Sequence, residues 1–250
     1  MDTPSIPIPP PQPAAALSEP ARIINTFIAP SKTFNDLKRS AAWWGPFVLG
    51  LIVTLVFVFL MDRQIGFEQI TRNAIAQSPR ADQFEKLPAD QREKQIAIST
   101  TITKYISYAS PVVSLIIYVI IAGVLLGVFN LAMGAGISFT TAWAIVWYGM
   151  LPMAVHGILG CVSMFGVDKE AFNPRNPVGT NPAFYMDQAG NKFLLGMASA
   201  LDVFSIWCIV LLGIGFACNS KVKRSTAITA VAVAYLVYKL AGSAIGSFFG

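Results

Sequence analysis

The stretch that decides the fold runs from residue 105 to residue 167 and reads YISYASPVVSLIIYVIIAGVLLGVFNLAMGAGISFTTAWAIVWYGMLPMAVHGILGCVSMFGV. It contains no Asp, Glu, Lys or Arg. A membrane-spanning helix needs about 20 mostly apolar residues, so this stretch is too long for one span and fits two. Gly134 and Gly136 lie near its middle, and paired glycines favour a turn. We therefore predict a helical hairpin with spans at about 111–133 and 138–165.

Three further uncharged stretches lie outside this hairpin, at residues 40–61, 203–220 and 225–238. Allowing for apolar flanks, they predict spans at about 43–61, 194–218 and 226–248. The predicted fold is therefore all-α, an integral membrane bundle of five transmembrane helices over residues 21–250. Loops at 62–107 and 166–193 lie on one side, and the odd number of spans places the two termini on opposite sides.

Composition supports a membrane protein over a soluble one. Hydrophobic residues make up 54% of the 250 residues, and charged residues make up 12%, about half of the roughly 25% found in soluble domains. The net charge of +5 is not gathered into the dense clusters of a soluble nucleic-acid binder, so no nucleic acid is expected. With one histidine and no Walker A, G-x-S-x-G or H-E-x-x-H string, the sequence predicts neither an enzyme nor a cofactor.

The segments before the first span differ in character. Residues 1–20 hold seven prolines and predict a disordered Pro-rich tail, with a docking peptide for a Pro-binding module as the alternative. Residues 21–42 carry apolar residues at helical spacing, interrupted at Pro30. This pattern predicts a broken amphipathic helix lying on an anionic leaflet.

The two long loops are also unlike each other. In 62–107, Phe67, Ile70, Ala74 and Ile75 recur at helical spacing, and the polar stretch 90–104 after Pro88 also favours a helix. Together they predict a small two-helix cap; a solvated spacer is the alternative. In 166–193, prolines, asparagines and glycines predict an irregular loop.

Cations gather on the side of the membrane that holds the N-terminus. Seven cations and three acids fall there, against ten cations and nine acids opposite. The raw count does not fix the orientation, but three cations in the short loop between the last two spans favour a cytoplasmic N-terminus. We predict a basic face for anionic lipid headgroups, made of Arg22, Lys32, Lys38, Arg39, Lys221, Lys223 and Arg224.

Asp202 and Lys239 are the charges that fall deep inside predicted spans. The two spans are joined by a tight turn, and at 1.5 Å per residue the two positions differ by only about 5 Å along the helix axes. A charge inside the bilayer costs about 2.5–3.5 kcal/mol, so we expect an intramembrane ion pair or a shared polar cavity. The alternative is that Lys239 extends alone to the interface.

Other residues inside the spans are weaker candidates. Pro152 predicts a helix kink. His156, with Met150, Met153 and Cys161, offers soft metal ligands, but their spacing turns around the helix and we predict no metal site. Two Gly-x-x-x-Gly pairs, at 123 and 127 and at 242 and 246, predict close helix packing inside the bundle, with a dimer face as the alternative.

Several strings occur together in a familiar order. FIAPSKTF (27–34) is followed by WWGPF (43–47), then GISF (136–139), and LDVFSIW (201–207) begins a span that ends in LGIG (212–215). This order resembles the bacterial branch of the Yip family, whose eukaryotic members are named for interaction with Ypt/Rab GTPases. The resemblance implies a five-span fold with a cytoplasmic N-terminus in the bacterial inner membrane.

The resemblance also implies non-catalytic work in membrane organisation. Our principal hypothesis is therefore a non-enzymatic membrane protein that organises lipids, a membrane-protein partner or further copies of itself. The alternative is a small transporter with a polar cavity around Asp202 and Lys239.

Overall fold

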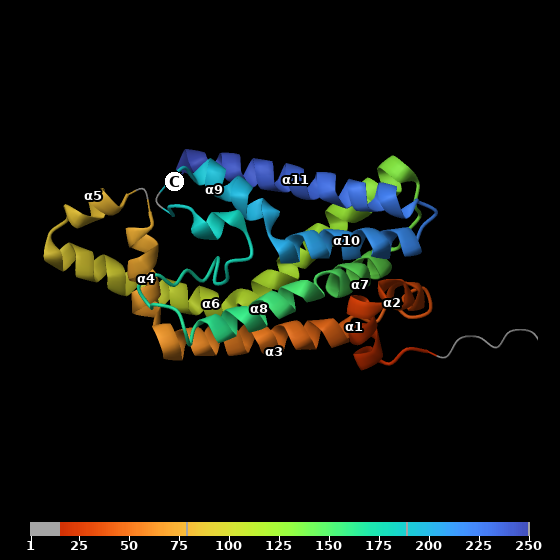
Figure 1. The fold of residues 1–250 in the computed structure, drawn as a ribbon, viewed down its shortest axis with the longest axis horizontal. Helices are drawn as coiled ribbons and strands as arrows, with labels where there is room; N and C mark the ends of the chain where they lie inside the picture. The colour runs from red at the N-terminus through yellow and green to blue at the C-terminus, as the bar shows by residue number, and fades with distance from the viewer. Residues whose placement is uncertain (1–15, 79, 189, 250) are drawn as a thin grey trace, which may run out of the picture.

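The computed structural model describes residues 16–78, 80–188 and 190–249, and in these residues it contains helices and loops but no strand. The long helices run roughly side by side and form a bundle with two distinct ends (Figure 1). Four helices are long and apolar enough to cross a membrane, or five if one bent pair counts as a single span. The predicted all-α membrane bundle is confirmed.

The chain enters the bundle through two short helices, α1 (Glu19–Ile28) and α2 (Pro30–Asp36). The break between them falls at Ala29, directly before Pro30, as the sequence predicts. The Ser18 hydroxyl caps α1 by accepting a hydrogen bond from the backbone of Ala21. Glu19 and Pro20 therefore belong to a helix and not to the predicted tail, most of which (residues 1–15) lies outside the described residues.

The prediction that the residues after Pro30 present an apolar face to lipid is wrong. Phe34 and Leu37 are 0% and 1% exposed, because they pack into the core of the bundle. In α1 the apolar residues divide: Ile23 and Phe27 face the core, whereas Ile24 and Ile28 are exposed. Of these two short helices, therefore, only α1 presents an apolar surface to lipid.

The first span is α3 (Trp44–Leu60), which continues through a π turn at Met61–Ile65. Two helices of the first long loop follow, α4 (Phe67–Ala76) and α5 (Ala81–Glu85). The next helix, α6, runs over Ala89–Gly127 and continues through a second π turn at Val128–Ala132. Helix α6 therefore begins well before the predicted residue 111, because the polar residues 90–104 form a helix as readily as the apolar ones that follow.

The predicted hairpin turn separates α6 from the next span, which consists of α7 (Phe139–Gly149) and α8 (Leu151–Ser163). Gly134 and Gly136 have φ of 61° and 67°, values that glycine adopts without strain. The Asn130 side chain closes the turn, since its amide donates to the Ile137 carbonyl and its oxygen accepts from the Ile137 backbone.

The fourth predicted span is not one continuous helix. It consists of α9 (Lys192–Ala198), a 3-10 turn (Ser199–Leu201) and α10 (Val203–Cys218), with a bend of 57° between the two parts. The last helix, α11 (Arg224–Phe249), packs closely on α10. A side chain at Gly213 would collide with the backbone of Ile228, so this close approach depends on glycine.

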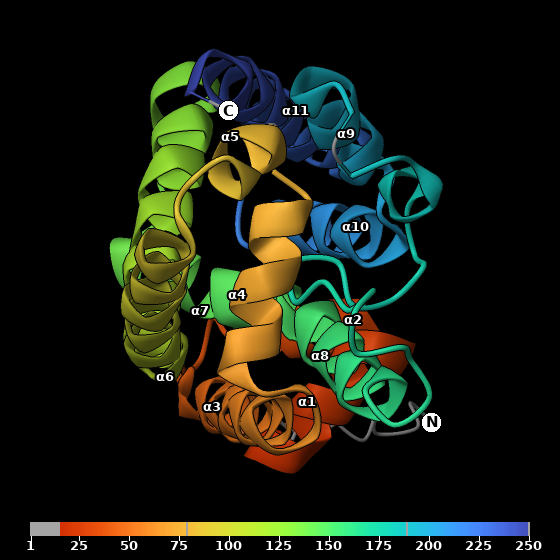
Figure 2. The ribbon, with the colours of Figure 1, turned by 90° about the vertical axis from the view of Figure 1, so that its left-hand side faces the viewer.

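The two ends of the bundle are made of different parts. At one end lie α2, residues 133–138 and the α10–α11 turn; we call it the basic end. At the other, α4 and α5 cross the bundle beside α9 and residues 166–192, which include a 3-10 turn (Pro182–Tyr185); we call it the loop end (Figure 2). Here Phe67 and Ile70 of α4 share a buried apolar cluster with Phe172, so the first long loop is a folded cap and not a solvated spacer.

Candidate functional site

The exposed cations of the basic end come from two segments that are distant in sequence. Hydrogen bonds hold these segments together: the Arg224 guanidinium donates to the Ser31 hydroxyl at 2.9 Å, and the Asn219 amide donates to the Phe34 carbonyl at 2.9 Å. Six of the seven predicted basic residues are exposed here. They are Lys32, Lys38 and Arg39 from α2 and the turn after it, and Lys221, Lys223 and Arg224 from the α10–α11 turn.

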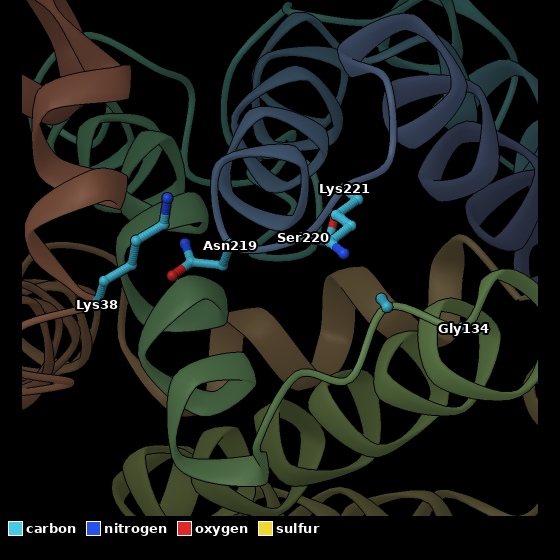
Figure 3. Close-up of a pocket in the computed structure, with 6 residues that line it drawn as sticks. Lys38, Gly134, Asn219, Ser220 and Lys221 are labelled. Atoms are coloured by element: carbon cyan, nitrogen blue, oxygen red, sulfur yellow. The ribbon is translucent and has the colours of Figure 1, made fainter.

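A cavity of about 420 Å³ lies among these segments. Lys38 and Lys221 border it from different segments, and Asn219 and Ser220 lie between them with the Gly134 turn opposite (Figure 3). Within the described residues, neither lysine takes part in an ion pair. The cavity therefore has two unneutralised ammonium groups at its border.

Arg22, the seventh predicted basic residue, does not lie on the lipid-facing surface. Its side chain is 2% exposed and is the largest fully buried side chain described in the protein. The guanidinium donates to Asp36 at 2.7 Å, to Glu19 at 3.1 Å and to the Ser40 carbonyl at 3.1 Å. A buried charge needs such partners, so the prediction for Arg22 is wrong: this cation holds together α1, α2 and the segment that connects α2 to α3.

This buried network continues into the membrane-spanning bundle. The Tyr148 hydroxyl of α7 donates to Glu19 at 2.6 Å, and the hydroxyls of Thr26 and Thr33 both donate to the Arg22 carbonyl. Gly45 makes room for the Glu19 carboxylate, because a side chain there would collide with it. The carboxylate also lies beside the first turn of α3, where the helix dipole favours negative charge.

The charges of the network shift one another's titration. Burial alone would raise the pKa of Asp36, but hydrogen bonds from Arg39 and Arg22 hold that pKa below its ordinary value of 3.8. Burial alone would lower the pKa of Arg22, and its bonds to Asp36 and Tyr148 raise the pKa instead. Both groups are therefore charged at neutral pH.

Asp202 is not in the middle of a helix but at the bend before α10. It is 7% exposed and caps α10, because its carboxylate accepts from the Ser205 backbone at 2.9 Å. The hydroxyl of Thr180, from the loop before α9, also donates to this carboxylate. The signal was present in the sequence, since Asp directly before an apolar run is a strong N-cap pattern.

Lys239 of α11 reaches the same bend but does not pair with Asp202 among the described residues. Its ammonium donates to the Ser199 hydroxyl at 3.0 Å and lies 5.8 Å from the centre of the Tyr235 ring. The predicted direct ion pair therefore does not form. Asp202 and Lys239 do lie at a similar depth along the two neighbouring helices. However, the Asp202 carboxylate caps the start of α10, in a span that the prediction had treated as one unbroken helix.

The remaining candidates lie inside the bundle. Pro152 is buried in the first turn of α8, and the helix is interrupted at Met150, two residues before it. The His156 ring packs edge-on against the Phe204 ring, with 5.3 Å between the two ring centres. Cys161, Cys208 and Cys218 are free, and no group of three metal-ligating side chains occurs in the described residues.

The two Gly-x-x-x-Gly pairs do not mediate packing inside the bundle. A side-chain carbon built at Gly123, Gly127, Gly242 or Gly246 meets no neighbouring atom within 4 Å. The prediction of internal packing is therefore wrong for both pairs, and both lie open on the outside of the bundle.

Comparison with known proteins gives one match. The family model described as the Yip1 domain matches residues 24–245, from within α1 to near the end of α11. No curated protein and no solved structure matches the chain.

Proposed function

The chain belongs to the Yip1-domain family, and on this premise we propose that it is a non-enzymatic multi-pass membrane protein whose basic end holds the phosphate headgroups of anionic lipids. The observation that carries the proposal is the gathering of six exposed cations at one end of the bundle, where two of them, Lys38 and Lys221, border a cavity. Each Lys or Arg near an anionic membrane surface contributes about 1 kcal/mol of attraction.

The position of these cations along the helices suits lipid headgroups. Lys221, Lys223 and Arg224 lie directly between the apolar helices α10 and α11. Lys38 and Arg39 lie between α2 and the first turn of α3, next to Trp43, and Trp is enriched at membrane interfaces. Charges at this depth meet headgroups and not acyl chains.

Helix dipoles work against an anion in this cavity. Helix α10 and the π turn after α6 both end beside it, and the C-terminal end of a helix carries partial negative charge. Backbone groups therefore offer a phosphate little here, and the attraction has to come from the lysine side chains.

The test is the affinity of the purified full chain, in a neutral detergent, for short-chain phosphatidylglycerol. We expect phosphatidylglycerol to raise the unfolding temperature more than phosphatidylcholine of the same chain length, because it binds the folded state. Lys38→Gln with Lys221→Gln removes about 2 kcal/mol and weakens the apparent affinity about 30-fold. Equal stabilisation by both lipids contradicts the proposal.

A matched control separates local binding from net charge. Lys86→Gln with Lys94→Gln removes two exposed cations from the loop end, and we expect it to leave the affinity unchanged. If it weakens binding as much as the Lys38 and Lys221 pair, the basic end is not the site. Glycerol phosphate alone is the further arm: stabilisation equal to that by the lipid indicates a soluble phosphate ligand.

We also propose that the basic end faces the cytoplasm of a bacterial cell, in the inner membrane. The three cations of the α10–α11 turn support this orientation, because short cytoplasmic loops are enriched in Lys and Arg. A reporter active only outside the cytoplasm, fused after residue 250, is expected to be active. Inactivity of that reporter, with activity of the same reporter fused within the α10–α11 turn, reverses the orientation.

The bend at Asp202 is the feature that favours the alternative of a small transporter, since broken helices often border transport sites. In our proposal the bend is structural. The polar groups there bond one another: Thr180 and Ser205 satisfy Asp202, and Ser199 satisfies Lys239.

A further inference from the structure

Helix α6 is much longer than a membrane requires. With its π turn it runs from Ala89 to Ala132, 44 residues, or about 66 Å at 1.5 Å per residue, against a hydrocarbon thickness of about 30 Å. Lys104 pairs with Asp62 at 3.4 Å, which places it level with the end of α3. The part of α6 before Lys104 therefore projects beyond the end of the first span, at the loop end (Figure 1).

The two faces of this projecting part have different surroundings. On one face Ile96 is 7% exposed, and the Thr100 hydroxyl bonds that of Thr71 in α4 at 3.2 Å. On the other face Ile98 and Ile102 are 53% and 52% exposed, and Tyr105 is 74% exposed. Ile98 and Ile102 precede Lys104 and lie outside the uncharged run 105–167, so we infer that these two large apolar side chains lie outside the hydrocarbon.

The exposed apolar face continues into the membrane at a regular spacing. We define the α6 stripe as eight residues, all exposed, separated alternately by four and three positions: Ile98, Ile102, Tyr105, Ala109, Val112, Ile116, Val119 and Gly123. Alternation of four and three is the pattern of the contact seam between two helices in a coiled coil. The stripe ends at Gly123, where a side-chain carbon would meet nothing within 4 Å, and Gly127 follows.

The spacing and the open glycine point to a helix as the covering partner. Apolar residues inside the bilayer need no partner, but Ile98 and Ile102 are outside it and lie on the same seam. Glycines spaced by four allow two helices to approach closely within lipid. One continuous helix with the same spacing can cover both regions, and α6, which continues through Pro111, supplies such a helix in every copy.

We propose that α6 is a dimer interface that binds α6 of a second copy in parallel, along this stripe. Two copies inserted in the same orientation are related by a two-fold axis along the membrane normal, which aligns the two stripes in register. In that register the flanking residue Lys94 faces Ser99 of the other copy, and Thr101 faces Ile106. No like charges meet beside the seam. This interface does not depend on the proposed lipid site, which is made of other residues at the other end.

The test is disulfide formation between single cysteines in native membranes, in a chain carrying Cys161→Ala, Cys208→Ala and Cys218→Ala. Ile102→Cys and Ile116→Cys lie on the stripe, one outside the membrane and one inside. Ala97→Cys and Ile117→Cys are matched controls, because both positions are exposed at similar depth but point away from the seam. We expect a disulfide-linked dimer from the two stripe positions and none above background from the controls.

Gly123→Leu provides a second variant. It is expected to abolish the cross-link at Ile102→Cys while leaving the unfolding temperature of the monomer unchanged, because the site is open in the single chain. Gly242→Leu, at the other open glycine pair, is expected to keep the cross-link. No dimer from either stripe position overturns the proposal, as do equal yields from stripe and control positions. Cross-linking of Ile102→Cys only to a different protein also overturns it and assigns the stripe to that partner.

Discussion

The basic end and the loop end carry their charges in different ways. At the basic end one cation, Arg22, is buried among several partners, while six others stay on the surface and two of these border a cavity. At the loop end cations and acids are nearly equal in number, and exposed pairs such as Arg72 with Glu68 and Lys104 with Asp62 neutralise one another. One end therefore has a net charge to present, and the other does not.

The loop end uses polar groups mainly to join its two long loops. The buried Asn73 amide of α4 donates to the carbonyls of Lys169 and Phe172, and the Lys192 ammonium donates to the carbonyl of Gln77. Buried polar groups therefore hold both ends together, whereas a net positive surface charge occurs at the end that we propose to bind lipid.

The largest expected loss of stability comes from replacing Arg22, the buried cation of the basic end. Arg22→Met leaves the largely buried Glu19 carboxylate without a cation and leaves Asp36 with Arg39 alone, and removal of one partner from a buried pair costs about 3–5 kcal/mol of unfolding free energy. The measurement is denaturant unfolding in detergent. Arg22→Lys is expected to restore only part of the loss, because an ammonium cannot reproduce the fork of bonds made by the guanidinium.

The matched control for Arg22 is Lys32→Met on the surface of the same end. It is expected to change the unfolding free energy by no more than about 0.5 kcal/mol. A similar small change in Arg22→Met would mean that the buried network does not hold the end together.

The second effect is at the loop end and is local. Asn73→Ala leaves two loop carbonyls without their donor, at a cost of about 1–3 kcal/mol. We expect hydrogen exchange to rise in residues 166–176 and to stay unchanged in α1 and α2. Thr101→Ala, an exposed change nearby, is the control. Unchanged exchange in 166–176 would show that the loops are held by their apolar cluster alone.

The contrast between the ends also explains what the sequence could reveal. Uncharged stretches located the spans, and Pro30 located the break between α1 and α2, because both signals are local. Arg22 looked like the other cations, since its partners Asp36 and Tyr148 are brought to it only by folding. A helix over 90–104 was predicted, but its continuation into the span was missed, because hydropathy marks where lipid begins and not where a helix begins.

The bend at Asp202 was predictable from local sequence but was obscured by the length of the apolar run. The N-cap pattern of Asp202 before residues 203–218 competes with hydropathy, which treats 194–218 as one span. The open surroundings of the glycine pairs could not be predicted, because a Gly-x-x-x-Gly spacing does not say which surface meets it.

The third effect depends on pH at the basic end. Because the pKa of Asp36 is lower in the folded chain than its ordinary value of 3.8, its contribution to stability is full above about pH 4 and is lost as the pH falls through the folded pKa. Asp36→Asn is expected to be less stable than the wild type at pH 7 by about 1.5–3 kcal/mol, with a smaller loss on acidification below pH 4. Unfolding curves from pH 7 to pH 3 measure both. An identical acid profile in the two proteins contradicts this role.

The smallest expected loss of stability comes from an exposed ion pair at the loop end. Arg72 and Glu68 form an exposed pair one helical turn apart in α4, with side chains 50% and 63% exposed. Glu68→Gln is expected to reduce the unfolding free energy by only about 0.3–0.5 kcal/mol, and less at high salt. A loss comparable with that of Arg22→Met would remove the distinction between buried and exposed charge.

The most direct test of the central claim is to map where a lipid headgroup contacts the folded protein. Phosphatidylglycerol with a photoreactive headgroup, mixed into a neutral bilayer around the full chain, can be cross-linked and the modified peptides identified. We predict labelling in residues 30–40 and 219–224, reduced by Lys38→Gln with Lys221→Gln and not by Lys86→Gln with Lys94→Gln. Equal labelling of the basic end and the loop end would contradict it.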